Sequence, residues 1–412
     1  MKKEIVVTGR GLVTPLGIGL AENEKALRCG ESGIVSVPEW RELGMESQVA
    51  GLVSDDIQCP FLDKKAQRYM SPNSVYAASA AYEALQEAGL TRDVLESKRV
   101  AVVLGHGGSC LKLVYDGART LIESGKSKRV SPFIVPKAMP SSSAANLSLI
   151  LGIKGESYVV SSACASGSHA IMLAARLLGS GAYDIVISGG TEELNWVHAL
   201  GFDAMRATSR GYNDRPKQAS RPFDKARDGF VIAAGAGIVV METAEHARSR
   251  GVKPSAKICS AVANSNATDM VSPDSDASAK LMMQCINEAG LDPSDIDYIN
   301  THGTATSVGD PIEMEAIKKV FAERRPDVAI NSTKSMTGHM IGATGAVEII
   351  FCTQMLKEKF ICPTINLENP EPEFSWANLP VKTIENAKIR YSLSNSFGFG
   401  GTNSCTILSS VD

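Results

Sequence analysis

Cys164 lies in a setting that suits a nucleophile. Only small residues flank it in the run Ser161–Gly167, so a substrate carbonyl could reach the sulfur. An apolar run, Tyr158–Val160, precedes it, and an apolar pattern of helical period follows. A thiol at the start of a helix lies beside free backbone N–H groups and the positive helix end. These would lower its pKa and keep the thiolate available near neutral pH. The alternative is a buried structural cysteine, because free cysteines are among the most buried residues.

Two later motifs contain side chains that could assist such a thiol. His302 occurs in Asn300–Thr306 (N-T-H-G-T-A-T), directly after an apolar run, where open α/β sheets bind their ligands. A loop histidine held by a backbone carbonyl would explain this motif as well. Lys334 and His339 occur in Asn331–His339, and packing alone does not readily explain them in so glycine-rich a stretch.

Two further motifs supply acidic groups and backbone donors. Gly309–Glu313 (G-D-P-I-E) opens a predicted helix, where Asp310 is expected to act as a cap and Glu313 could neutralise Lys334. The run Asn395–Asn403 (N-S-F-G-F-G-G-T-N) places glycines beside two aromatic side chains. That composition suits an oxyanion-binding N–H group and an apolar gate.

The elements that must position these groups alternate between short apolar strands and helices. The alternation pauses near Gly251–Pro254 and then starts again. We therefore predict two βαβ-type halves, residues 1–255 with the cysteine and 256–412 with the histidines. Such halves predict parallel sheets with helices between and around them. Long insertions at 30–70, 105–145 and 195–225 are expected to cap the first half.

Composition narrows the class of protein. A chain of 412 residues is too long for one simple core. Its net charge of −3 argues against nucleic-acid binding. The nine cysteines include no C-x-x-C pair, which favours a reducing compartment and hence the cytoplasm. We expect no membrane insertion, because no stretch approaches the roughly 18 apolar residues of a membrane span. The N-terminus is expected to form a first strand and not a signal peptide.

Taken together, these motifs resemble those of the β-ketoacyl-[acyl-carrier-protein] synthases. The resemblance runs from V-T-G-x-G-x-V-T-P-L-G at the N-terminus to the last strand, and it matches the elongating branch with a Cys-His-His triad. The stretches R-D-G-F-V-I-A, E-E-L-N-W and F-D-A-M look closer to type I than to type II. The resemblance implies an α/β, thiolase-like fold with pseudo-repeated halves stacked as α-β-α-β-α. It also implies a homodimer in which the strand near 156–160 pairs across the dimer axis.

The resemblance further implies an acyltransferase of fatty-acid elongation. Cys164 would take an acyl chain from an acyl-carrier protein and hold it as a thioester. The N–H groups of Cys164 and Phe399 would bind the oxyanion. Neutral His302 and His339 would stabilise the enolate formed when malonyl-carrier protein loses CO₂, and the new carbon–carbon bond would lengthen the chain by two carbons.

Other residues receive supporting roles from the resemblance. Lys334 would hold positive charge and pair with Glu313, and Phe397 would support the gate formed by Phe399. No cofactor is required for the chemistry beyond the carrier's phosphopantetheine arm, which would contact Thr304 and Thr306. A structural Na⁺ or K⁺ would be bound by Asn300, Glu348, Ser394 and Asn395. The acidic carrier protein would dock on two basic patches, Lys64, Lys65 and Arg68, and Lys126, Lys128 and Arg129.

Three alternatives remain open. A ketosynthase of a polyketide or polyene pathway would carry the same triad. A non-catalytic partner subunit that sets chain length would lack the nucleophile, so Cys164 argues against it. A thiolase would need a second catalytic cysteine, and Cys405 lacks a glycine-flanked setting.

The remaining histidines, His106, His169, His198 and His246, are expected to do no chemistry. His106 departs from the small residue usual at its position, which affects the expected chain-length preference.

Overall fold

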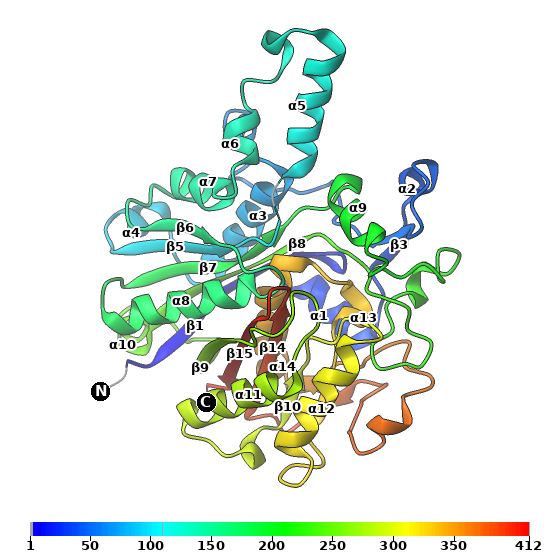
Figure 1. Cartoon of the computed structure of the whole chain (residues 1–412). Helices are drawn as coiled ribbons and strands as arrows, with labels where there is room; N and C mark the ends of the chain where they lie inside the picture. Colours follow the sequence, from blue (N-terminus) through cyan, green and yellow to red (C-terminus); the bar gives the residue numbers. More distant parts are fainter. Residues whose placement is uncertain (1–2, 109, 412) are drawn as a thin grey trace.

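The structure, a computed structural model, describes residues 3–108 and 110–411, so the outermost residues of both predicted halves lie outside it. Its main strands form two sets with the same internal order (Figure 1). The first set, in spatial order, is β6 (Ser157–Val160), β5 (Val100–Gly105), β7 (Ile185–Glu192), β8 (Gly235–Thr243) and β1 (Ile5–Thr14). The second is β11 (Ala329–Asn331), β10 (Tyr298–Asn300), β14 (Tyr391–Gly398), β15 (Thr402–Ser409) and β9 (Ala256–Ser265). The two halves therefore repeat one topology.

The sheets are mixed, so the prediction of parallel sheets was wrong for part of each half. β5 is parallel to β6 and β7, and β10 is parallel to β11 and β14. β8 and β15, by contrast, run antiparallel to both of their neighbours. Only Phe399–Gly401 connects β14 to β15, which is too short for a crossover and forces a hairpin. β1 joins the two sets, because Ile5–Val7 also pairs with Ala256–Ile258.

Helices cover both sheets and fill the space between them. The outer helices of the first half are α3 (Pro72–Glu87) and α7 (Ser142–Leu151), and those of the second half are α11 (Ser275–Ala289) and α12 (Gly309–Phe321). The central layer contains α8 (Ser166–Ser180) and α14 (Thr344–Glu358), which pack against each other and against both sheets. This arrangement confirms the predicted α-β-α-β-α stack (Figure 1).

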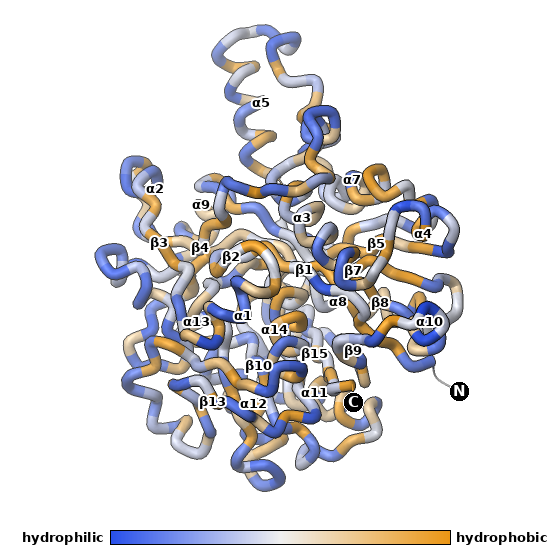
Figure 2. Tube along the Cα trace, turned by 180° about the vertical axis from the view of Figure 1, so that it is seen from behind, coloured by the Kyte–Doolittle hydropathy of each residue, from blue (hydrophilic) through white to orange (hydrophobic). Residues whose placement is uncertain are grey.

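Each interface between layers has an apolar core. One cluster surrounds the central helices, a second lies between α3, α7 and the first sheet, and a third lies between α11, α12 and the second sheet. Figure 2 shows β5, β7 and β8 largely in the hydrophobic colours. Strands that are buried on both faces need such continuous apolar sequences.

The remaining elements are mostly short, and several of them lie in the predicted insertions. Between β1 and α3 lie β2 (Gly17–Ile18), α1 (Leu20–Cys29), β3 (Ile34–Ser36), α2 (Pro38–Glu42) and β4 (Val49–Gly51). The other short elements are α4 (Arg92–Glu96), α6 (Ile134–Ala138), α9 (Trp196–Ala204), α10 (Ala244–Ser249), α13 (Lys334–Thr337), β12 (Phe360–Ile361) and β13 (Ile384–Glu385). α5 (Leu111–Ser124) projects from the body of the molecule (Figure 1), and none of its residues is buried. Within the described part of the chain, no helix is both long and apolar enough to cross a membrane.

Candidate active site

Cys164 lies in the tight turn between β6 and α8. The residue before it, Ala163, has a φ of 48°, a left-handed conformation that is uncommon for residues other than glycine. The Ser166 hydroxyl stabilises this turn by accepting a hydrogen bond from the Ser162 N–H (2.9 Å) and donating one to the Ala163 carbonyl (2.6 Å). The turn therefore fixes the thiol at the start of the central helix. Strain of this kind is common at functional sites.

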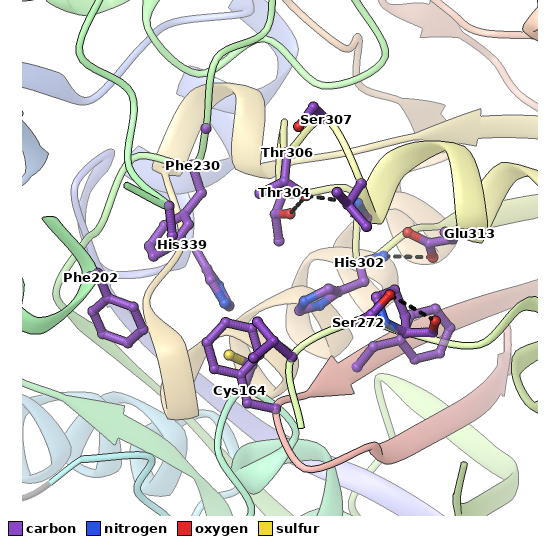
Figure 3. Close-up of a pocket in the computed structure, with 18 of the residues that line it drawn as sticks. Cys164, Phe202, Phe230, Ser272, His302, Thr304, Thr306, Ser307, Glu313 and His339 are labelled. Atoms are coloured by element: carbon purple, nitrogen blue, oxygen red, sulfur yellow. Dashed lines mark hydrogen bonds between the residues drawn. The ribbon is translucent and has the colours of Figure 1, made fainter. Parts of the chain in front are cut away.

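Two histidines from the second half meet this thiol in one pocket. The Cys164 sulfur, a ring nitrogen of His302 and a ring nitrogen of His339 all lie within 4.8 Å of one another. The pocket has a volume of about 740 Å³, and Phe230 and Phe399 also line it. Figure 3 shows both imidazole rings directed toward the sulfur. The sequence motifs that are far apart along the chain thus converge.

The carboxylates of α12 position the loop that carries His302. Glu313 accepts hydrogen bonds from the N–H groups of His302 (2.9 Å) and Gly303 (2.8 Å). Asp310 accepts one from the Ala305 N–H (3.1 Å). The expectation that Asp310 caps its own helix was therefore wrong, because its oxygens hold neighbouring loops. Burial raises the pKa of Glu313 to about 7, although the two N–H groups oppose this rise.

The His339 ring is held from one side and open on the other. Its Nδ1 lies 3.0 Å from the Thr344 hydroxyl, and its Nε2 has no hydrogen-bond partner among the described residues. Burial and the Lys334 charge hold the pKa of His339 well below its ordinary value, and they do the same for His302. Both imidazoles are therefore neutral near pH 7, and each can donate one ring N–H.

Lys334 forms its ion pair with Glu348, so the predicted pairing with Glu313 was wrong. The Lys334 Nζ lies 2.8 Å from Glu348 Oε1, and both side chains are 1% exposed. Glu313 is already occupied by the two loop N–H groups and by the Asn395 side-chain amide (3.2 Å). Lys334 begins α13 and faces α14, which brings Glu348 to it.

The expectation of a readily available thiolate was also wrong for the substrate-free pocket. Burial raises the pKa of Cys164 to about 12. The Lys334 charge and the N–H groups of Cys164 and Phe399 lower this pKa but do not outweigh burial. The helix-end argument considered only local dipoles, whereas the loss of solvent around the sulfur dominates. A base that takes the thiol proton would assist attack by the sulfur, and the neutral imidazoles of His302 and His339 lie close enough for this role.

The other predicted residues fall into three groups. Thr304, Thr306 and Phe397 line the pocket. The residues of the two basic patches are exposed and lie outside the pocket lining. A buried oxygen without a hydrogen-bond partner among the described residues occurs in each residue of the predicted cation site, Asn300, Glu348, Ser394 and Asn395.

Sequence reasoning missed Thr344, which orients His339, and the role of Glu348 as the partner of Lys334. The hydroxyl of Thr344, five residues after His339, could have been recognised from the sequence. The contact between Glu348 and Lys334 could not, because it depends on how α14 is rotated about its axis. Cys405, the residue that a thiolase would use, is buried in β15 and does not line the pocket.

Two models of one family match successive parts of the chain. Residues 2–247 match "Beta-ketoacyl synthase, N-terminal domain", and residues 255–368 match "Beta-ketoacyl synthase, C-terminal domain". The chain belongs to the β-ketoacyl synthase family. The synthase is 42% identical over 405 residues to "3-oxoacyl-[acyl-carrier-protein] synthase 1" of Haemophilus influenzae, with 98% of each chain covered. It is 39% identical over 410 residues to "3-oxoacyl-[acyl-carrier-protein] synthase 2" of Vibrio cholerae, covering 98% of this chain and 99% of the other.

A solved structure confirms the fold of the synthase. The synthase superposes on the crystal structure of a β-ketoacyl synthase from Burkholderia phymatum with a TM-score of 0.93, at 33% sequence identity, and each chain is covered completely. The thiolase-like fold inferred from the motifs is therefore confirmed along the full length of the chain.

We expect Lys334 to set the lowest pH at which the synthase remains active. Lys334→Met combined with Glu348→Gln removes the ion pair without leaving a buried unpaired charge. Because the Lys334 charge lowers the pKa of both imidazoles, its removal raises these pKa values and protonates the rings at higher pH. The rate of malonyl decarboxylation should therefore fall more at about pH 6 than at about pH 8. A pH–rate profile checks this, and an unchanged acid limb would contradict it.

Proposed function

We propose that Cys164 holds the growing acyl chain in the decarboxylative condensation of fatty-acid elongation. The Cys164 sulfur attacks the thioester of acyl-carrier protein, and the bond from the acyl carbonyl to the pantetheine sulfur breaks. The proton that leaves Cys164 passes through a neutral imidazole to the departing pantetheine thiol. The N–H groups of Cys164 and Phe399 donate to the tetrahedral oxyanion, as preorganised donors do in acyl transfer.

The second half-reaction uses the two imidazoles. Malonyl-carrier protein enters, its carboxylate leaves as CO₂, and the electron pair of the broken bond forms an enolate. His302 and His339 each donate a ring N–H to the enolate oxygen. The enolate carbon then attacks the acyl–Cys164 carbonyl, and the carbon–sulfur bond breaks to release a product lengthened by two carbons. The Cys164 thiolate takes up a proton from solvent and returns to the thiol.

One observation carries this proposal, namely that the sulfur and two neutral imidazole nitrogens lie within 4.8 Å of one another in one pocket. The test is a condensation assay with malonyl-carrier protein and acyl-carrier proteins of graded length, including a cis-unsaturated chain. We expect a β-ketoacyl product with two added carbons and loss of one CO₂ per turnover. CO₂ release without chain growth for every acyl length would overturn the proposal. The longest accepted chain, and whether intermediates are released, would distinguish fatty-acid elongation from a polyketide or polyene pathway.

We infer that acyl-carrier protein is the partner and that its phosphopantetheine arm passes Thr304 and Thr306 on its way to Cys164. The pocket lining that contains both threonines supports this path. Their hydroxyls lie 3.2 Å apart, near the start of α12. The motifs that favour type I support assignment to that branch. Nine cysteines, none in a disulfide among the described residues, support action in the cytoplasm.

Charge reversal at the first basic patch should weaken carrier binding without changing the chemistry. Lys64, Lys65 and Arg68 are exposed, and the carrier protein is acidic. Replacing all three with Glu should raise KM for the carrier substrates by about 10-fold or more and leave kcat nearly unchanged. Exposed Lys382 and Lys388, both changed to Glu, provide the matched control and should leave KM unchanged. Equal KM values for the two charge-reversed proteins would contradict this docking site.

We propose that the synthase is a homodimer joined at β6. This strand ends the first sheet, and its residues are partly exposed. An apolar edge strand invites pairing with a second copy. Leu149, on the neighbouring α7, is 75% exposed, as expected for a residue covered by a partner. This exposed edge supports the proposed interface.

A charge at Leu149 should weaken the dimer. Leu149→Glu would bury a carboxylate in the proposed interface and raise the dimer dissociation constant at least about 10-fold. Val381→Glu is the matched control, because Val381 is also exposed (54%) but lies in the second half. Sedimentation velocity over a range of concentrations measures both. A Leu149→Glu protein that dimerises as tightly as the control would refute this interface.

We also propose that a monovalent cation binds next to Glu348 and stabilises the active site. Asn300 and Ser394 are opposite each other in the β10–β14 register, and Asn395 follows. The buried unpartnered oxygens form a donor set that fits Na⁺ or K⁺, which prefer oxygen ligands: Asn300 Oδ1, Ser394 Oγ, Asn395 Oδ1 and Glu348 Oε2. Such an ion would fix the carboxylate that pairs with Lys334.

A further inference from the structure

A buried ion pair lies behind the catalytic turn and has no part in the chemistry described above. His106 follows β5, Glu192 ends β7, and His106 Nε2 lies 2.9 Å from Glu192 Oε1. The two side chains are 1% and 0% exposed. Neither residue lines the pocket. A fully buried pair of this kind is costly to desolvate, so its position calls for an explanation.

The Glu192 carboxylate connects the loop after β5 with the segment that follows His339. It accepts hydrogen bonds from the N–H groups of Gly107 (2.8 Å) and Gly342 (3.0 Å). Gly342 lies three residues after His339, so the Glu192 carboxylate anchors the segment that carries this histidine. The contact is close, because a Cβ on Gly342 would lie 2.1 Å from the Gly107 nitrogen.

The anchored segment is strained at Ile341. This residue has a φ of 45°, a left-handed conformation that is a genuine outlier for a β-branched side chain. Ile341 lines the pocket, and it belongs to the apolar cluster around Cys164. A backbone in such a conformation persists only where several surrounding contacts hold it in place. The Glu192 hydrogen bond to Gly342 is directly next to the strained residue.

The surroundings favour the charged form of both residues, which strengthens the anchor. Burial lowers the pKa of His106, but the Glu192 carboxylate outweighs it, and the net pKa lies above the ordinary value. Burial raises the pKa of Glu192, but His106 outweighs it, and the net pKa is lowered. The carboxylate is therefore ionised, and hydrogen bonds to an ionised acceptor are about twice as strong as neutral ones.

We propose that Glu192, paired with His106, is a positioning residue that holds the strained turn at Ile341 so that the His339 ring faces Cys164. This inference rests on the proposed function, because its readout is the step assigned to His339. Loss of the pair would let the turn relax and move the imidazole away from the enolate. Misplacement by about 1 Å can cost on the order of 100-fold in rate.

The test compares His106→Ala with the conservative His106→Gln in the full-length enzyme. Malonyl-carrier protein decarboxylation and acylation of Cys164, followed by intact mass, are measured separately. In His106→Ala we expect kcat for decarboxylation to fall about 10- to 100-fold with little change in KM, and acylation to change much less. His106→Gln keeps a donor to Glu192 and should restore most of the decarboxylation rate. His246→Gln, at a histidine that pairs with Glu242 outside the pocket lining, is the matched control and should leave both steps unchanged.

Folding of each variant is checked by circular dichroism and thermal unfolding. Glu192→Gln keeps the side-chain volume, and it decides the matter if His106→Ala does not fold; the same selective loss of decarboxylation is expected. Equal loss of both steps, no loss, or failure of both variants to fold would overturn the positioning role. A wild-type enzyme whose decarboxylation does not depend on His339 would refute the proposed function instead, so the two failures are distinguishable.

Discussion

The Cys164→Ala variant is expected to lose acyl transfer and chain extension together. Without the sulfur no covalent acyl intermediate forms, and the loss should approach the roughly 10⁶-fold that follows removal of a catalytic nucleophile. Decarboxylation of malonyl-carrier protein should persist, because His302 and His339 remain in place. Intact mass spectrometry after incubation with acyl-carrier protein, and a chain-extension assay, measure the two losses.

The control for this variant is Cys29→Ala, which removes an exposed cysteine outside the pocket. It should acylate and extend chains at the wild-type rate. Chain extension that continues in Cys164→Ala would rule out this residue as the nucleophile. Loss of decarboxylation as well would indicate a collapsed pocket, which thermal unfolding would reveal.

The His339→Ala variant is expected to separate the two half-reactions. The ring contributes an N–H donor to the enolate, and removal of one positioned donor typically costs about 10²–10³-fold in rate. Acylation of Cys164 should survive much better, because its oxyanion is bound by the N–H groups of Cys164 and Phe399 and His302 can still take the thiol proton. Release of CO₂ from malonyl-carrier protein and acylation of the thiol are measured on the same preparation.

His246→Gln is the control for this substitution. His246, in α10, pairs with Glu242 of β8 and lies outside the pocket lining, so its loss should leave both half-reactions unchanged. If His339→Ala reduced acylation as strongly as decarboxylation, the assignment of this ring to the enolate would be incorrect.

The meeting of Cys164, His302 and His339 was predicted from the family resemblance of their motifs. Each motif follows a strand, but Cys164 follows β6 of the first set and the histidines follow β10 and β11 of the second, so local patterns alone could not bring them together. The partner of Lys334 could not be predicted in this way. Which carboxylate reaches it depends on the rotation of α14, and Glu313 was already engaged by backbone donors.

The pKa of Cys164 was missed because it depends on tertiary contacts. The thiol pKa follows from burial by segments distant in sequence, whereas the prediction used only the adjacent helix end. The antiparallel pairing of β14 and β15, by contrast, follows from the short connection Phe399–Gly401 and could have been predicted from the sequence. The docking, cation and dimer residues stay predictions, because their partners are other molecules.

The burial of Cys164 has a consequence for reagents that modify thiols. Peroxides and soft electrophiles attack thiolates, and burial raises the pKa of this sulfur, so it should react with them more slowly than an exposed cysteine such as Cys29. Inactivators that mimic the acyl thioester and fit the pocket should therefore modify Cys164 more effectively than simple alkylating reagents.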